Sequence, residues 1–150
     1  MATYSLADTA IEGVEVIEDN ILGQGSYGVV YKAKYFGSPV AAKRLHSIFF
    51  ESGTGEDQVK GILEGFSKEL ALLKMLKHPN IVEFLGVFNP NKEARNETIV
   101  LTENSFIVCE IMVTSLQDRL VKQPHLSFRQ IVDISAQITY GLRYLHEREV

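Results

Sequence analysis

The most informative stretch of this chain is Gly23-Gln24-Gly25-Ser26-Tyr27-Gly28-Val29-Val30. Glycine has no Cβ, so the backbone at Gly23, Gly25 and Gly28 can turn tightly and approach a phosphate group closely. A dinucleotide-binding fold would continue with a helix whose N-terminus faces the pyrophosphate. The β-branched pair Val29-Val30 and the aromatic Tyr31 predict a strand instead. The Gly-Lys-Ser/Thr ending of a P-loop is also missing. The stretch therefore predicts a strand–loop–strand flap over a nucleotide.

A single lysine, Lys43, follows the glycine stretch on the next predicted strand, Val40–Leu45. The turn signal Gly37-Ser38-Pro39 separates this strand from the one before it. Side chains two residues apart on a strand point to the same face, so Ala41 and Lys43 share a face. A small apolar residue beside a lysine suits a purine ring next to its phosphates. The alternative is a solvated strand lysine, which the neighbouring Arg44 would favour.

The middle of the chain carries a helical pattern. Apolar residues recur at spacings of three and four at Ile62, Phe66, Leu70, Leu73 and Leu76. This spacing places them on one stripe of a helix. The helix is predicted to end at His78-Pro79, because the residue before a proline is disfavoured in the helical region. Glu64 and Glu69 lie on this helix, and the plain expectation for a helical glutamate is a solvated face.

The remaining pattern gives an order of elements. Ile81–Phe88 and Ser105–Met112 predict two further strands. Ser127 with Gln130 three residues later is a capping-box start, and a further apolar stripe continues that helix to Leu145. The sequence therefore predicts five strands with one helix after the third, followed by a helical region.

Composition excludes several classes of protein. A hydrophobic fraction of 45% indicates a globular chain. A net charge of −4 without a basic block argues against nucleic-acid binding. No apolar run approaches the ~20 residues that span a bilayer. Cys109 is the single cysteine, so no intramolecular disulfide can form, and we expect a reducing, cytoplasmic location.

Several short motifs follow one another in a fixed order. They are Gly-x-Gly-x-x-Gly-x-Val at Gly23–Val30, Val-Ala-x-Lys at Val40–Lys43, a helical Glu69, His-Pro-Asn-Ile-Val at His78–Val82, Cys-Glu-Ile-Met at Cys109–Met112, and Gly-Leu-Arg-Tyr-Leu-His at Gly141–His146. Taken together, they resemble the protein kinase domain. Within that family, Phe84–Val87 and Gly37–Ala41 look most like the tyrosine-kinase-like group.

The resemblance implies an α+β fold with a five-stranded antiparallel sheet and one helix, followed by the first helices of an incomplete helical lobe. Residues 1–16 would be a lead-in segment. Residues 17–112 would be the ATP-binding lobe ending in the hinge, and residues 113–150 would be the start of the helical lobe.

The resemblance also implies a set of ATP-binding residues, namely Gly23, Gly25, Gly28, Val30, Ala41, Lys43, Glu69, Cys109, Glu110 and Met112. Val30 and Ala41 would stack on the adenine, and Cys109 would be the gatekeeper at the back of the pocket. Backbone groups of Glu110 and Met112 would bind the adenine edge. By its spacing from His78–Val82, Glu69 rather than Glu64 would hold Lys43 on the α- and β-phosphates.

The family's catalytic motifs, His-Arg-Asp and Asp-Phe-Gly, would lie beyond Val150. We therefore expect no catalytic and no metal-binding residue within these 150 residues, with the ligands of Mg²⁺ also lying further on. The fragment itself should be inactive, whereas its full-length form would phosphorylate protein substrates on Ser/Thr (or Tyr) hydroxyls. Two alternatives are a non-catalytic nucleotide-binding or regulatory half-kinase module and a Rossmann-type oxidoreductase. The strand predicted after the glycines argues against the latter.

Overall fold

The computed structural model describes residues 9–25, 28–45, 70–90 and 104–150. The chain divides into two compact units. The first contains Met1–Leu76 and Glu83–Ile111, and the second contains Lys77–Val82 and Met112–Val150.

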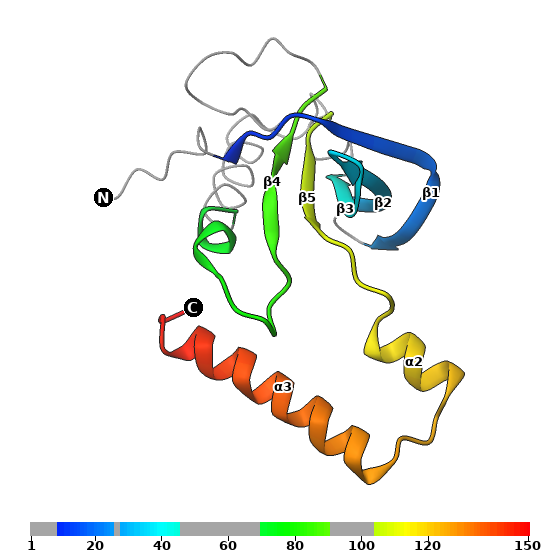
Figure 1. Cartoon of the computed structure of the whole chain (residues 1–150), viewed down its shortest axis with the longest axis vertical. Helices are drawn as coiled ribbons and strands as arrows, with labels where there is room; N and C mark the ends of the chain where they lie inside the picture. Colours follow the sequence, from blue (N-terminus) through cyan, green and yellow to red (C-terminus); the bar gives the residue numbers. More distant parts are fainter. Residues whose placement is uncertain (1–8, 26–27, 46–69, 91–103) are drawn as a thin grey trace, which may run out of the picture. The chain divides into compact units, whose positions relative to one another are not determined.

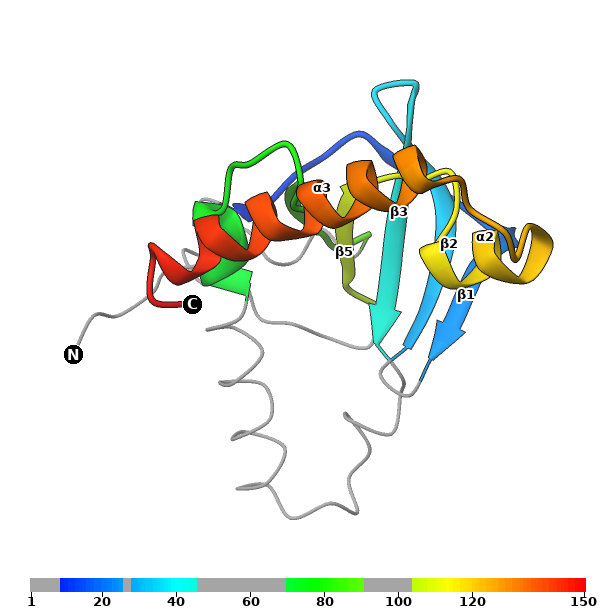
Figure 2. The same ribbon diagram turned by 90° about the horizontal axis from the view of Figure 1, so that it is seen from below.

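The first unit is built on a five-stranded antiparallel sheet with the strand order β1-β2-β3-β5-β4 (Figure 1). The strands are β1 (Val14–Gly25), β2 (Gly28–Tyr35), β3 (Ser38–Leu45), β4 (Phe84–Phe88) and β5 (Phe106–Glu110). Figure 2 shows β1, β2 and β3 side by side. The prediction of five strands in this chain order is confirmed. Their ends differ, because β1 begins before Ile17, β4 begins after Ile81 and β5 ends before Met112.

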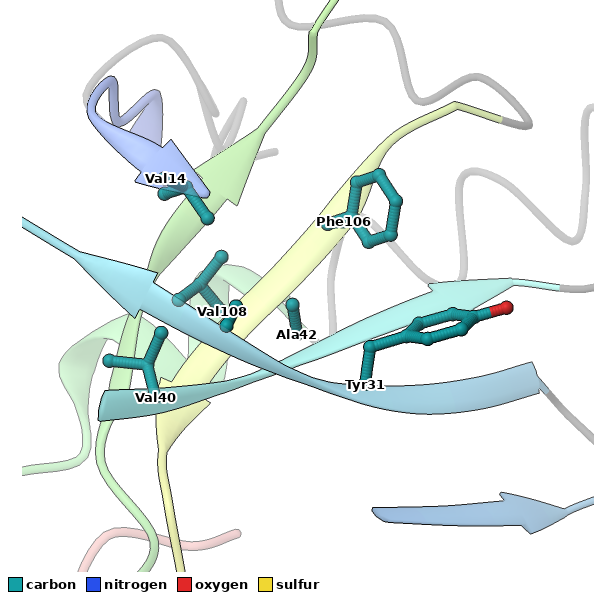
Figure 3. Close-up of a cluster of buried hydrophobic side chains, with 7 residues drawn as sticks. Val14, Tyr31, Val40, Ala42, Phe106 and Val108 are labelled. Atoms are coloured by element: carbon teal, nitrogen blue, oxygen red, sulfur yellow. The ribbon is translucent and has the colours of Figure 1, made fainter. Parts of the chain in front are cut away.

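One face of this sheet, the core face, carries a buried apolar cluster (Figure 3). Its buried members are Val14, Tyr31, Ala33, Val40, Ala42, Phe106 and Val108. The cluster follows from strand periodicity, because alternate residues of β2, β3 and β5 point to the same side. The rings of Tyr31 and Phe106 meet edge to face with their centroids 6.3 Å apart, a favourable aromatic arrangement.

The opposite face, the lysine face, packs on a helical segment at residues 70–75. Its cluster contains Leu70, Phe84, Val87 and Ile107, with Leu73 and Cys109 packed against it. Helical structure ends before His78-Pro79, as the proline predicts. The predicted helix residues up to Glu69 lie outside the described part of the chain.

The second unit contains α2 (Leu116–Lys122) and α3 (Phe128–His146). The capping box predicted at Ser127 is present, since its hydroxyl accepts from the Gln130 N–H and the Gln130 side chain accepts from the Ser127 N–H. Residues 77–82 pack on α3. The Lys77 N–H donates to the Tyr144 hydroxyl at 2.9 Å, and Gly141 lies so close to the Asn80 carbonyl that a Cβ would be 3.0 Å from that oxygen. This packing explains why the apolar residues at the predicted start of β4 are not strand.

Candidate nucleotide-binding site

The glycine stretch forms a hairpin. Gly25 pairs with Gly28 across the β1–β2 connection, and Gly23 pairs with Val30. A strand therefore continues after the glycines, which is the feature that separates this fold from a dinucleotide-binding fold. A Cβ built at Gly23 or Gly25 would meet no heavy atom of the described residues within 4 Å. Packing within that part of the chain does not explain these glycines, whereas close approach of a ligand would.

Four predicted site residues share the lysine face of three adjacent strands. Val30 on β2 pairs with Lys43 on β3, and Ala41 on β3 pairs with Cys109 on β5. Directly paired residues of antiparallel strands point to the same side of a sheet. All four side chains are half-buried, whereas Tyr31, Val40, Ala42 and Val108 on the core face are buried. The sheet register thus brings a cation, a small side chain, a valine and a thiol together.

Cys109 on β5 is the member of this group that packs against the apolar cluster of the lysine face. That cluster includes Leu70 and Phe84. Burial raises the pKa of the Cys109 thiol, an effect that the positive charge of Lys43 partly opposes and the carboxylate of Glu110 reinforces. The thiol is therefore held neutral at physiological pH and contributes a small apolar surface rather than a nucleophile.

Glu110, at the end of β5, is fixed by reciprocal hydrogen bonds with Glu83. The Glu110 N–H donates to the Glu83 carbonyl at 2.9 Å, and the Glu110 carboxylate accepts from the Glu83 N–H at 2.7 Å. These bonds tie the end of β5 to the residue that precedes β4. Met112 belongs to the second unit and its side chain is 51% exposed.

Two further predictions concern charge and metal. Glu69, the predicted partner of Lys43, lies outside the described residues. Among residues 9–25, 28–45, 70–90 and 104–150, no three side chains of His, Cys, Asp or Glu gather closely enough to hold a metal ion.

Sequence reasoning missed one electrostatic feature of the sheet, on the face opposite Lys43. The Arg44 guanidinium donates to the Tyr31 hydroxyl at 2.7 Å and lies 5.1 Å from the centre of the Tyr31 ring. It also lies 3.8 Å from the Glu18 carboxylate. The alternation of a strand was the available signal, because consecutive cations on β3 must point to opposite faces.

A five-stranded antiparallel sheet with a glycine hairpin at one edge, a half-buried lysine on one face and a helical segment on that same face defines the N-terminal lobe of a protein kinase. The sequence model of the family described as "Protein kinase domain" matches residues 16–150. The chain belongs to this family, as its motifs predicted.

Known relatives agree with this assignment. The probable serine/threonine-protein kinase kinY of Dictyostelium discoideum is 28% identical over 151 residues, covering 96% of this chain and 24% of that protein. The seven transmembrane domain-containing tyrosine-protein kinase 1 of the same organism is 32% identical, covering 85% of this chain and 17% of that protein. The Raf homolog serine/threonine-protein kinase of Caenorhabditis elegans is 31% identical, covering 86% and 14%.

The chain thus spans about a quarter or less of the length of these three relatives. Both serine/threonine and tyrosine kinases are among them. Within the described ranges, no helix is both long and apolar enough to cross a lipid bilayer.

Proposed function

We propose that this chain is the ATP-binding part of a protein kinase that transfers the γ-phosphoryl group of ATP to the Ser/Thr (or Tyr) hydroxyls of proteins. The observation that carries the proposal is the shared face of Val30, Ala41, Lys43 and Cys109 beside the Gly23–Gly28 hairpin. This face offers a separate feature for each part of the nucleotide.

The adenine would pack against Val30 and Ala41. Both are apolar and half-buried. They are diagonal neighbours on β2 and β3, because Val30 pairs with Lys43 and Ala41 pairs with Lys32. Ala41 has only a methyl group, which leaves room above the strand for a flat ring. The N–H of Glu110 donates to the Glu83 carbonyl, so the carbonyl of Glu110 would be the backbone group that meets the adenine edge.

The phosphates would lie between Lys43 and the glycine hairpin. An ammonium group bonded to a phosphate oxygen makes a charge-assisted hydrogen bond, the strongest kind in this site. The space beside Gly23 and Gly25 allows the backbone to approach the phosphates. Mg²⁺ would accompany the ATP and neutralise the charge of its phosphates. We infer that Glu69 orients Lys43, as its place in the motif order suggests.

These 150 residues contain neither His-Arg-Asp nor Asp-Phe-Gly, the motifs that supply the base and the metal ligands in kinases. We infer that the 150-residue chain binds ATP without transferring its phosphoryl group. A second candidate function, a non-catalytic nucleotide-binding or regulatory module, rests on this same observation. The two functions differ in whether a longer form that carries both motifs transfers phosphate to a protein.

The test is a calorimetric titration of the 150-residue chain with ATP, in the presence and absence of Mg²⁺. NAD serves as the comparison ligand, and a radiolabelled transfer assay on a protein substrate runs in parallel. We expect saturable ATP binding, no NAD binding and no transfer. Failure to bind ATP at millimolar concentration would contradict both candidate functions, and transfer by the 150 residues would contradict the inference of inactivity.

A further inference from the structure

Residues 9–13, which precede β1, are attached to the sheet at both ends. The sequence predicted only a lead-in segment there. Thr9 is buried and Ile11 packs against the core-face cluster. We call Thr9–Gly13 the N-terminal strap.

The first attachment is at the free edge of β4. Ala10 forms a parallel bridge with Val87, and the Ile11 N–H donates to the Val87 carbonyl at 3.0 Å. Gly86 makes this approach possible. A Cβ at Gly86 would lie 2.5 Å from the Ile11 Cγ2 atom and 2.6 Å from the Thr9 carbonyl oxygen. Any residue other than glycine would therefore push the strap away from β4.

The second attachment is at the β2–β3 turn. The Phe36 N–H donates to the Gly13 carbonyl at 3.0 Å. The Phe36 ring covers Gly13 so closely that a Cβ there would lie 2.7 Å from the ring. Phe36 itself has a positive φ of 46°, a conformation that glycine adopts more readily. Phe36 is 77% exposed, and it thus keeps an unfavourable backbone conformation while its ring contacts the strap.

The strap lies at the end of a continuous row of paired residues across the whole sheet. In order, the row is Ala10, Val87, Ile107, Lys43, Val30 and Gly23. Each member is the direct partner of the next. The single bridge made by the strap is therefore in register with the lysine and with the first glycine of the hairpin.

We propose that the N-terminal strap is a positioning element for the nucleotide site. By pairing with the free edge of β4, it fixes the position of the row of paired residues that carries Lys43. Gly86 and Phe36 are its two positioning residues, and neither touches the nucleotide. The coupling to ATP rests on the proposed function, whereas docking of the strap does not. Release of the strap would let the β4–β5 pair shift and displace Lys43 from the phosphates.

The experiment combines hydrogen exchange with ATP titration on the full chain. The Ile11 amide reports strap docking directly, because its N–H bonds to Val87. Gly86→Ala is expected to accelerate exchange at Ile11 and to weaken ATP binding about three- to tenfold, which lies within the range of coupling that mutations away from a ligand produce.

Phe36→Gly guards against a folding defect in the first variant, because it removes the ring contact while relieving the positive φ of Phe36. It should change both readouts in the same direction. Lys34→Ala, at an exposed residue of the same hairpin, is the matched control and should change neither.

Faster exchange at Ile11 with unchanged ATP affinity in both variants would overturn the positioning role and leave the strap as packing alone. Unchanged exchange in Gly86→Ala would overturn the attachment itself. If the parent chain binds no ATP, the proposed function and the coupling fail together, while exchange at Ile11 still reports whether the strap docks.

Discussion

The two faces of the sheet are made by alternate residues of the same strands, yet they are built differently. On the core face, Ala42 and Val108 are completely buried and Phe106 is 4% exposed. On the lysine face, Ala41 and Lys43 on the same strand β3 are half-buried. The consecutive alanines Ala41 and Ala42 thus differ in burial, and the consecutive cations Lys43 and Arg44 point to opposite faces. The core face is determined by packing, whereas packing alone does not account for the small and charged side chains of the lysine face.

The same contrast explains how stability and binding can be separated. Apolar burial on the core face stabilises the sheet in a way that is independent of any ligand. Substitutions there should lower the free energy of unfolding. Matched substitutions on the lysine face should mainly change nucleotide affinity.

The largest effect is expected from Phe106→Ala on the core face. The ring packs 6.3 Å from the rings of both Tyr31 and Phe88, so its loss leaves a cavity. We expect the free energy of unfolding to fall by about 3–5 kcal/mol, measured by urea denaturation. The control is Ile21→Ala, since Ile21 on β1 is 56% exposed and should change stability little. Equal effects of the two substitutions would contradict the assigned core.

A matched pair on β3 makes the sharpest comparison of the two faces. Ala42→Leu adds volume to a completely buried site and should lower the free energy of unfolding by about 1–3 kcal/mol. Ala41→Leu should leave stability nearly unchanged and weaken ATP binding about tenfold or more, because the added side chain fills the space proposed for the adenine. Denaturation and calorimetry on both variants provide the measurement. The same response from both would abolish the distinction between the faces.

The smallest effect concerns the thiol of Cys109 on the lysine face. Because burial raises the pKa of Cys109, the folded chain should react with iodoacetamide slowly, and the rate should rise only at a pH above that of an ordinary thiol. Because the unfolded thiol releases its proton at a lower pH than the folded one, stability should fall as pH rises above the unfolded-state pKa, until the folded-state pKa is passed. The control is the same single cysteine in denaturant, followed by mass spectrometry. Equal alkylation rates in the two states would contradict this environment.

Local signals were enough to predict much of the fold. The β-branched pair after the glycines predicted the hairpin, Pro79 predicted the end of the helix, and Ser127 with Gln130 predicted the start of α3. Each of these features depends on a few neighbouring residues, so a single sequence reveals it.

Tertiary contacts decided the rest. Ile81 and Val82 suggested strand, but residues 77–82 are attached to α3 through the Tyr144 hydroxyl, a partner far away in sequence. The strap could not be predicted from a periodic pattern of apolar residues. It is held by backbone hydrogen bonds and by the close approach that the missing Cβ of Gly86 allows. The short helix α2 did carry a signal, Ser115 capping the N–H of Asp118, which the sequence analysis overlooked.

The site was predictable to the extent that strand alternation determines it. Ala41 and Lys43 were expected on one face, and the register adds Val30 and Cys109 to that face. The pairing of β3 with β5 could not be read from local pattern, because it joins segments separated by the helix and by β4. In that respect the motif order carried information that periodicity did not.

The most direct test of the nucleotide site compares the consecutive cations of β3, Lys43 and Arg44. ATP is titrated into Lys43→Met and Arg44→Met, with the folding of each variant checked by denaturation. We expect Lys43→Met to weaken ATP binding about 10- to 100-fold, the loss of one hydrogen bond to a charged group. Arg44→Met should bind ATP as the parent does and lose about 1 kcal/mol of stability, because its bond to the Tyr31 hydroxyl is gone. Equal ATP affinities of the two variants would contradict the claim that the lysine face is the nucleotide site.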